Sequence, residues 1–403
     1  MHPPNMGRPL DLLYPTLGNS YDIRTWSGSV YFIAKTLEAK GARLHRLNEL
    51  EQKRLLLHKV VNRLYGLMGA HGPMPIERSM RMAERFAGSI SKHLDKGRHD
   101  AVFSPSSIPV ALLKTSRPKV FITDATFADL LEQYPELSSY PQELVHEGHE
   151  LERAALANCD LAFYASHWAA GSAVRRYGAD PAKVRVVPFG SNLGLQVPDE
   201  LILRAIEERP MERCDLLLLG VSWERKGGPL AVQVVEELNK AGLPSTLTVI
   251  GCTPPAGTPM QHVRVLPFID KSTAMGQRRL INHLLRSHFL LLPSVAECYG
   301  IVYAEASSLG VPSLARDVGG VGEVVQAGKN GFLFNPTDGP APYTEKILAL
   351  MADREAYREL AHSAMNEHKR KLNWDVAGAA IMGEMTRLVG KGTGMDLARA
   401  VNG

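Results

Sequence analysis

The sequence lacks the motifs that usually hold a metal ion or the phosphates of ATP. Its 403 residues include only four cysteines, and no two of them form a Cys-x-x-Cys pair, so neither a zinc site nor a disulfide framework is predicted. No Asp-x-Asp occurs, which removes a common acidic clamp for a divalent cation. No Gly-x-x-x-x-Gly-Lys-Ser/Thr occurs either, which argues against a P-loop NTPase. His146 and His149 are three residues apart, not the four of a metalloprotease helix, and we predict no metal site.

Long apolar runs are also absent. No uninterrupted apolar segment approaches the roughly 18 residues of a membrane span, and the first residues have no basic flank leading into an apolar core, as an export signal would. Together with the few cysteines, this predicts a cytoplasmic protein, with at most a peripheral contact to the inner face of the membrane. Hydrophobic residues make up 45% of the chain and charged residues 22%, as in ordinary globular proteins. The length suits two domains.

Strand and helix patterns alternate along the chain, which predicts an α/β fold with parallel sheets. In the first half, the predicted strands are 10–14, 101–103, 119–123 and 161–164, and the predicted helices are 30–37, 57–68, 82–94 and 143–158. In the second half, the predicted strands are 216–219, 245–250, 263–266 and 289–292, and the predicted helices are 229–241, 276–286, 301–309, 343–351 and 354–369. The second half therefore reads as a Rossmann-like domain.

A loop and helix near residue 300 carry two glutamates at a fixed spacing. Glu297 and Glu305 follow the apolar run 288–293, and the pattern places Glu297 in a loop and Glu305 in the early turns of a helix. The first backbone N–H groups of a helix have no intrahelical acceptor, and the helix dipole favours an anion there. Glu305 would accept from a diol such as a ribose, and Glu297 from hydroxyls of the group that the phosphate carries. A carboxylate, an anion-binding helix start and a second carboxylate, in this order, suit a nucleoside-diphosphate sugar. The alternative is one glutamate that caps the helix and another that is exposed to solvent. The predicted donor contacts of this segment are Cys298, Tyr299, Gly300, Ile301, Val302 and Glu305.

The segment from Glu297 to Glu305 resembles the Glu-x7-Glu signature of family 4 retaining glycosyltransferases. The resemblance is specific over about residues 155–340 and diffuse before them. It continues through segments at 160–166, 184–190, 216–228, 305–312, 318–324 and 328–334.

The resemblance implies the GT-B fold, in which two Rossmann-like domains face a central cleft. Residues 1–195 would form the acceptor-side domain and residues 210–375 the nucleotide-sugar domain. A helix from about 376 to 403 would cross back to the first domain.

The resemblance also implies a retaining hexosyltransferase that needs no metal or other cofactor and uses a nucleoside-diphosphate sugar as co-substrate. Arg225 and Lys226 follow the strand 216–219, so they lie at its carboxyl end, where open α/β sheets bind ligands. Their charges would stabilise the leaving diphosphate, and the alternative is a basic pair on the surface. In the family's proposed front-face mechanism the leaving phosphate takes the acceptor proton, so Glu297 would orient the sugar and need not be a nucleophile. Many members have an arginine directly after the strand's glycine, where this chain has Val221.

Four further residues are candidates through the same resemblance. Gly28 precedes a helix and suits a close approach of the donor phosphate, although the family's usual Gly-Gly is here Ser27-Gly28. Asp124 ends a strand where many relatives have a histidine, so it is a candidate catalytic contact for the donor sugar or the acceptor. The alternative is that Asp124 caps the helical segment that follows. Phe268 lies in a segment that resembles the base-proximal loop, and Ser222 precedes the Arg225-Lys226 pair as a further donor contact.

Two other functions stay open at this point. A GT-B sugar-nucleotide epimerase or hydrolase would share the fold and the donor, and would release free sugar without an acceptor. A non-catalytic two-lobed sugar-binding protein would bind sugar without needing a nucleotide. The base, the sugar and the acceptor, whether a glycan, a lipid-linked or a small molecule, are not identified by the sequence, and no nucleic-acid partner is predicted.

The positive charge of the chain is concentrated in one region. The formal net charge is +4, whereas residues 51–100 hold ten basic and five acidic residues, an excess of five. We predict that residues 51–98 contact anionic lipid or hold a lipid-linked or anionic acceptor. The alternative is that the apolar stripes pack on the domain's own sheet and the charges face solvent. The basic residues beside the stripes are Lys53, Arg54, Lys59, Arg63, Arg81 and Arg85.

Overall fold

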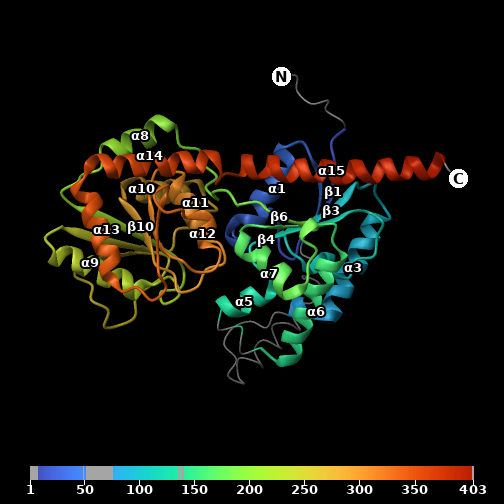
Figure 1. Cartoon of the computed structure of the whole chain (residues 1–403), viewed down its shortest axis with the longest axis horizontal. Coiled ribbons are helices and arrows are strands. Elements are labelled where there is room, and N and C mark those ends of the chain that lie inside the picture. The colour runs from blue at the N-terminus through green and yellow to red at the C-terminus, as the bar shows by residue number, and fades with distance from the viewer. Residues whose placement is uncertain (1–7, 49, 51–75, 135–136, 138–139, 402–403) are drawn as a thin grey trace. The chain divides into compact units, whose positions relative to one another are not determined.

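The computed structural model describes residues 8–48, 50, 76–134, 137 and 140–401 (Figure 1). The predicted helix at 57–68 and the basic residues Lys53, Arg54, Lys59 and Arg63 lie outside the described residues. The chain divides into two compact units. The first comprises Met1–Val187 with Trp374–Gly403, and the second comprises Pro188–Asn373.

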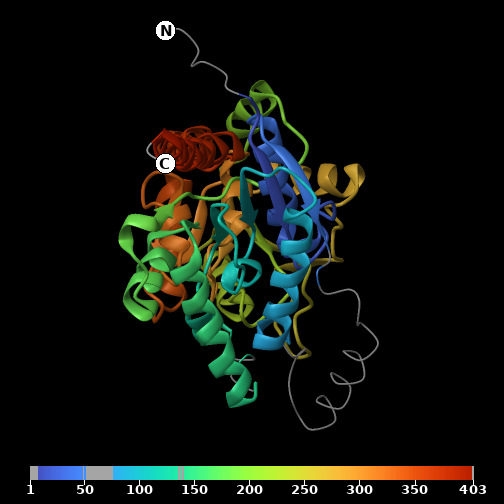
Figure 2. The same ribbon diagram turned by 90° about the vertical axis from the view of Figure 1, so that its right-hand side faces the viewer.

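The first unit holds a six-stranded parallel sheet with the strand order β2-β1-β3-β4-β5-β6. Its strands are β1 Asp11–Pro15, β2 Arg43–Leu47, β3 Ala101–Ser104, β4 Lys119–Thr123, β5 Leu161–Tyr164 and β6 Val184–Val186. Its helices are α1 Ser29–Ala39, α3 Met80–Leu94, α4 Ile108–Ala111, α5 Phe127–Gln133, α6 Gln142–Asn158, α7 His167–Tyr177 and α15 Trp374–Val401. Figure 2 views this unit with α15, in red, nearly end-on.

The second unit holds another six-stranded parallel sheet, in the order β12-β11-β10-β7-β8-β9. Its strands are β7 Cys214–Leu219, β8 Ser245–Ile250, β9 Val263–Leu266, β10 Phe289–Leu292, β11 Ser313–Arg316 and β12 Gly331–Phe334. Its helices are α8 Asp199–Glu207, α9 Gly228–Lys240, α10 Ala274–Arg286, α11 Ile301–Ser307, α12 Val321–Val324, α13 Pro340–Ala352 and α14 Arg354–Arg370. The chain runs outward from β7 through β8 to β9 and then returns to β10 on the other side of β7. The two units confirm the predicted fold class of paired Rossmann-like α/β domains.

The boundaries of the units differ from the predicted ones by several residues. Residues 188–209 belong to the second unit, although we predicted that the first domain extends to residue 195 and that the second begins at residue 210. Arg209, at the end of this segment, is buried and donates to the Gly310 carbonyl at 2.7 Å and to the Tyr357 hydroxyl at 3.0 Å. Such long-range contacts leave no local sequence pattern.

The last helix packs on α1 in the first unit. The Thr36 hydroxyl donates to the Trp374 carbonyl at 3.3 Å. A Cβ atom on Gly378 would lie 2.2 Å from the Thr36 methyl group, so the two helices approach closely because this position has no side chain.

Four strands of the sheets were not predicted. They are β2, β6, β11 and β12, and all of them are short. β2 has the sequence Arg-Leu-His-Arg-Leu and lies at an edge of its sheet, where pairing with β1 holds it despite its charge. Strand preference depends on such neighbours, so a single-strand pattern cannot reveal it.

The described part of the basic region shows where its apolar stripe lies. Phe86 and Ile90 of α3 are buried in the first unit, whereas Arg81 and Arg85 are exposed. The Ser79 side chain accepts from the Met82 amide at 3.4 Å and caps α3. The stripe of α3 therefore belongs to the core, and only its basic face is available to a partner.

All four cysteines are buried, and burial raises the pKa of the Cys159 thiol to about 12, so this thiol stays protonated at neutral pH. Within the described ranges, no helix has both the length and the apolar character required to cross a membrane.

Candidate functional site

Two loops meet at the point where the second sheet reverses its strand order. One loop follows β7 and carries Arg225, and the other follows β10 and carries Glu297. The Val295 amide donates to the Arg225 carbonyl at 2.8 Å, and the Arg225 guanidinium donates to the Ala296 carbonyl at 3.2 Å. The carboxyl ends of strands beside such a reversal are where open α/β sheets bind ligands.

Glu297 lies between two basic side chains that are distant in sequence from it. The Lys226 ammonium donates to Glu297 Oε2, and Arg225 Nη1 lies 3.7 Å from the same oxygen. Lys226 and Glu297 are both buried, and Arg225 is half-buried. A buried ion pair is weak evidence for stability, because desolvation offsets much of the attraction. The position of this pair, at the carboxyl ends of β7 and β10, instead makes it a candidate contact for a charged ligand.

Glycines give the Lys226 loop its shape. A Cβ on Gly220 would lie 2.5 Å from the Lys226 side chain, so the stem of Lys226 crosses the end of β7 where no side chain opposes it. Gly227 has φ +74, and its Cβ would lie 2.1 Å from the Pro293 carbonyl oxygen. Gly228 packs against the ring of Trp223, which a Cβ would approach to 2.3 Å. The loop therefore requires Gly227 and Gly228 to bring Lys226 to β10.

At the start of α11, the loop after β10 presents backbone N–H groups, because the side chains before the helix are buried. Gly300 has φ 86 and precedes α11, and the first amides of the helix, at Ile301 and Val302, have no intrahelical acceptor. The side chains of Cys298 and Tyr299 are buried. Burial, and then the Glu323 charge, raise the pKa of Tyr299, whose hydroxyl donates to the Phe189 carbonyl at 3.0 Å. A ligand would therefore meet this segment through its N–H groups.

Glu305 lies within α11 and is fully buried. Its Oε1 accepts from the Lys271 ammonium at 2.6 Å. Its Oε2 is buried and has no hydrogen-bond partner among the described residues. A buried polar atom left unpaired costs roughly 1–3 kcal/mol, so this oxygen is a candidate acceptor for a ligand hydroxyl. We did not predict Lys271 as a site residue. Its one sequence signal is its position five residues after β9, beyond the carboxyl end of a parallel strand.

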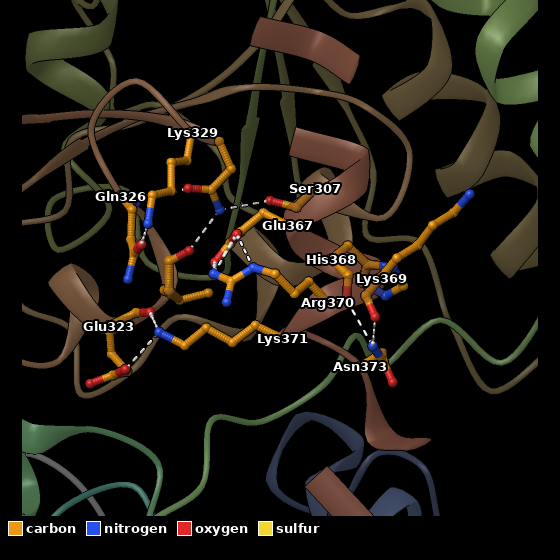
Figure 3. A network of polar contacts seen from close by, with 12 residues as sticks. Ser307, Glu323, Gln326, Lys329, Glu367, His368, Lys369, Arg370, Lys371 and Asn373 are labelled. Atoms are coloured by element: carbon orange, nitrogen blue, oxygen red, sulfur yellow. Dashed lines mark hydrogen bonds and ion pairs between the residues drawn. The ribbon is translucent and has the colours of Figure 1, made fainter. Parts of the chain in front are cut away.

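A polar network lies next to the loop at Gly319-Gly320, and Figure 3 shows its contact between Lys371 and Glu323. The Gly320 amide donates to the Cys298 carbonyl at 3.0 Å. The Lys371 ammonium donates to the Glu323 carboxylate at 2.7 Å and to its backbone carbonyl at 3.1 Å. These contacts connect α12, and with it the loop at Gly319-Gly320, to the end of α14.

The candidates of the first unit lie on loops at the carboxyl ends of β1 and β4. Gly28 has φ 98 and precedes α1, and Trp26 and Ser27 before it have φ 47 and 55. Consecutive non-glycine residues in the left-handed region are strained, and such strain is concentrated at functional sites. Asp124 is half-buried after β4. The alternative role of Asp124 as a helix cap is wrong, because Thr126 caps α5 by accepting from the Asp129 amide.

The remaining predicted residues have different environments. Ser222 is half-buried and its carbonyl accepts from the Lys226 amide at 3.0 Å, whereas the ring of Phe268 is exposed. Among the described residues, no group of three or more His, Cys, Asp or Glu side chains could hold a metal ion. His149 instead shares a 2.8 Å hydrogen bond with the Tyr177 hydroxyl. The structure thus brings Arg225, Lys226 and Glu297 together, and places Gly28 and Asp124 in the other unit.

Comparison with protein families gives one match in the second unit. The model of the family "Glycosyl transferases group 1" matches residues 213–353. This range contains Arg225, Lys226, Glu297 and Glu305, and also Lys271.

Curated relatives agree with that match. The chain is 30% identical over 230 residues to a D-inositol 3-phosphate glycosyltransferase of Streptomyces scabiei, covering 52% of this chain and 50% of the relative. It is 29% identical over 245 residues to the enzyme of the same name from Xylanimonas cellulosilytica, covering 57% and 58%. The chain thus spans about half the length of the curated relatives that it matches.

Solved structures extend the likeness to both units. A sucrose-phosphate synthase from Thermosynechococcus elongatus gives a TM-score of 0.68 at 17% identity, over 95% of this chain and 100% of that chain. HepE from Anabaena, solved in complex with UDP-glucose, gives 0.60 at 15% identity, over 94% and 100%. At these identities the likeness shows the fold, which is that of the GT-B glycosyltransferases.

Proposed function

We propose that this protein is a retaining glycosyltransferase that moves a sugar from a nucleoside-diphosphate sugar to a hydroxyl acceptor. The observation that carries the proposal is the arrangement of Glu297 with Lys226 and Arg225 at the strand reversal of the second sheet. The group 1 match over residues 213–353 and the glycosyltransferase names of the relatives support it.

In this proposal each side chain acts on a different part of the donor. Lys226 and Arg225 release part of their attraction to Glu297 and stabilise the negative charge that develops on the leaving diphosphate. The amides at the start of α11 donate to a phosphate oxygen, and Glu305 accepts from the ribose hydroxyls. Glu297 accepts from sugar hydroxyls and orients the anomeric carbon. The acceptor proton passes to the leaving phosphate, so no enzymatic nucleophile is required.

The first unit would supply the acceptor side and part of the sugar contact. Gly28 would allow a donor phosphate to approach the backbone, and Asp124 would contact the donor sugar or the acceptor hydroxyl. The acceptor would be a glycan, a lipid-linked molecule or a small molecule. This assignment rests on the resemblance and on the left-handed backbone at Trp26, Ser27 and Gly28.

A donor panel tests the proposal directly. UDP-, GDP-, ADP- and TDP-sugars are compared by thermal unfolding, because a ligand at about 100 times its dissociation constant stabilises the folded state by about 2.7 kcal/mol. The anomeric configuration of the product, followed by NMR, then tests retention. Release of free sugar at the rate of transfer, without an acceptor, would favour an epimerase or hydrolase. If none of the four donors stabilises the protein, the proposal is contradicted.

We expect transfer to persist in excess chelator. The charge of the leaving diphosphate is met by Arg225, Lys226 and backbone amides, so no divalent cation is needed at that position. The measurement is the initial rate of transfer with and without EDTA, on protein dialysed against chelator. Loss of transfer in EDTA, restored by magnesium or manganese, would overturn this charge assignment.

We also propose that the basic region of the first unit contacts an anionic surface or acceptor. Arg81 and Arg85 are exposed on α3, and each basic residue near an anionic membrane contributes about 1 kcal/mol. Binding to anionic but not neutral vesicles, released by high salt, is the expected result. Replacing Lys59, Arg63, Arg81 and Arg85 with Glu should abolish the vesicle preference and leave donor binding unchanged. Equal binding to both kinds of vesicle would mean that these charges only face solvent.

A further inference from the structure

The ion pair between Lys271 and Glu305 is asymmetric. The Glu305 side chain is 1% exposed and the Lys271 side chain 21%, so a ligand that approaches the pair meets the ammonium first. Lys271 belongs to the loop between β9 and α10, and its own carbonyl accepts from the Gln277 side chain at 2.8 Å. The backbone of Lys271 is therefore tied to α10, while its flexible side chain reaches α11.

A buried carboxylate of this unit can have both of its oxygens occupied by one partner. Glu367 is an example, because Arg370 donates to its Oε1 at 2.7 Å and to its Oε2 at 2.8 Å (Figure 3). Glu305 differs, since Lys271 occupies Oε1 and leaves Oε2 buried without a partner. A buried carboxylate that keeps one free oxygen is suited to accept a further hydrogen bond.

We propose that Lys271 is a positioning residue for nucleotide recognition, which holds the Glu305 carboxylate in an orientation that leaves its second oxygen to accept a ribose hydroxyl. This inference rests on the proposed function and adds a residue to it. Without its bond to the Lys271 ammonium, the buried Glu305 carboxylate would turn away toward another partner. A displaced carboxylate then makes a weaker bond to the ribose, since the strength of a hydrogen bond depends on its distance and angle.

The expected consequence is a coupling between Lys271 and one ribose hydroxyl. UDP, GDP and ADP are each compared with their 2′-deoxy and 3′-deoxy counterparts by titration calorimetry, with wild type, Lys271→Met, Glu305→Gln and the double variant. In the wild type, removal of one hydroxyl should weaken binding at least about ten-fold. In Lys271→Met the same removal should cost less than about three-fold. In the double variant, removal of the hydroxyl should weaken binding to the same extent as in Glu305→Gln alone, because Lys271 acts through Glu305.

Two controls separate this role from a structural one. Lys119→Met removes an ammonium whose side chain is 11% exposed beside Asp160 in the first unit, and it should leave the discrimination at the wild-type value. Lys271→Gln, which keeps a hydrogen-bond donor without the charge, replaces Lys271→Met if that variant does not fold. If the Lys271 variants keep the wild-type ratio of ribose to deoxyribose affinity, whether or not their overall affinity falls, this inference is wrong. The proposed function would be unaffected by that result. Failure of every nucleoside diphosphate to bind the wild type would overturn the proposed function, and this inference with it.

Discussion

Replacement of Lys226 with alanine is expected to lower the turnover number by on the order of 10²-fold or more. Removal of one preorganised donor to developing charge has effects of this size. Lys226 is buried, and its ammonium already bonds to Glu297, so its position is fixed before a donor arrives. Arg225 lies farther from the same carboxylate, at 3.7 Å, and cannot replace a contact that belongs to Lys226. The measurement is single-turnover transfer at saturating donor.

A matched control distinguishes lost catalysis from lost folding. Lys369 forms an exposed ion pair with Asp199 in the same unit, and Lys369→Ala should leave turnover unchanged because such surface pairs contribute little. Lys226→Ala leaves Glu297 without its nearest countercharge, so thermal unfolding of the free variant is recorded alongside. Turnover within about three-fold of the wild type, in a folded Lys226→Ala protein, would exclude Lys226 from charge stabilisation.

Replacement of Glu305 is expected to reduce nucleotide affinity, whereas replacement of Glu297 is expected to reduce turnover. Glu305→Ala should weaken binding of the free nucleoside diphosphate by roughly 1–3 kcal/mol, through loss of a charge-assisted bond to the ribose. Glu297→Ala should instead lower turnover and leave the affinity for free nucleotide near that of the wild type, because Glu297 meets the sugar. Calorimetric titration with the nucleoside diphosphate and transfer kinetics with the complete donor measure the two effects.

The contrast between the variants is the test of this division. An equal fall of free-nucleotide affinity in both variants would mean that Glu297 also serves the nucleotide. Retention of full turnover in Glu297→Ala would remove it from the sugar site altogether. Each variant also leaves a basic partner unpaired, Lys226 or Lys271, so Glu297→Gln and Glu305→Gln provide versions with less change of shape.

Most of the long elements followed from local patterns. The spacing of apolar residues predicted β5 at 161–164, β8 at 245–250, β9 at 263–266 and β10 at 289–292, and these ranges match the structure. β5 and β10 are buried throughout and read as continuous apolar runs, which are recognisable in one segment alone. α11 ends at Ser307 rather than at the predicted Leu309, because helix ends depend on the turn that follows.

The sequence by itself determined the paired α/β architecture and the nature of the charged side chains in the candidate site. The order of strands was decided only by the tertiary structure, and that order joins Lys226 to Glu297 across 71 positions of the chain. The same holds for Lys271 and Glu305, which are 34 positions apart in different loops and elements. Local patterns fix strands and helices, because their hydrogen bonds and apolar periods repeat within a few residues. Which side chains meet at the edge of a sheet depends on which strands become neighbours. The local periodicity of the sequence does not determine the order of the strands.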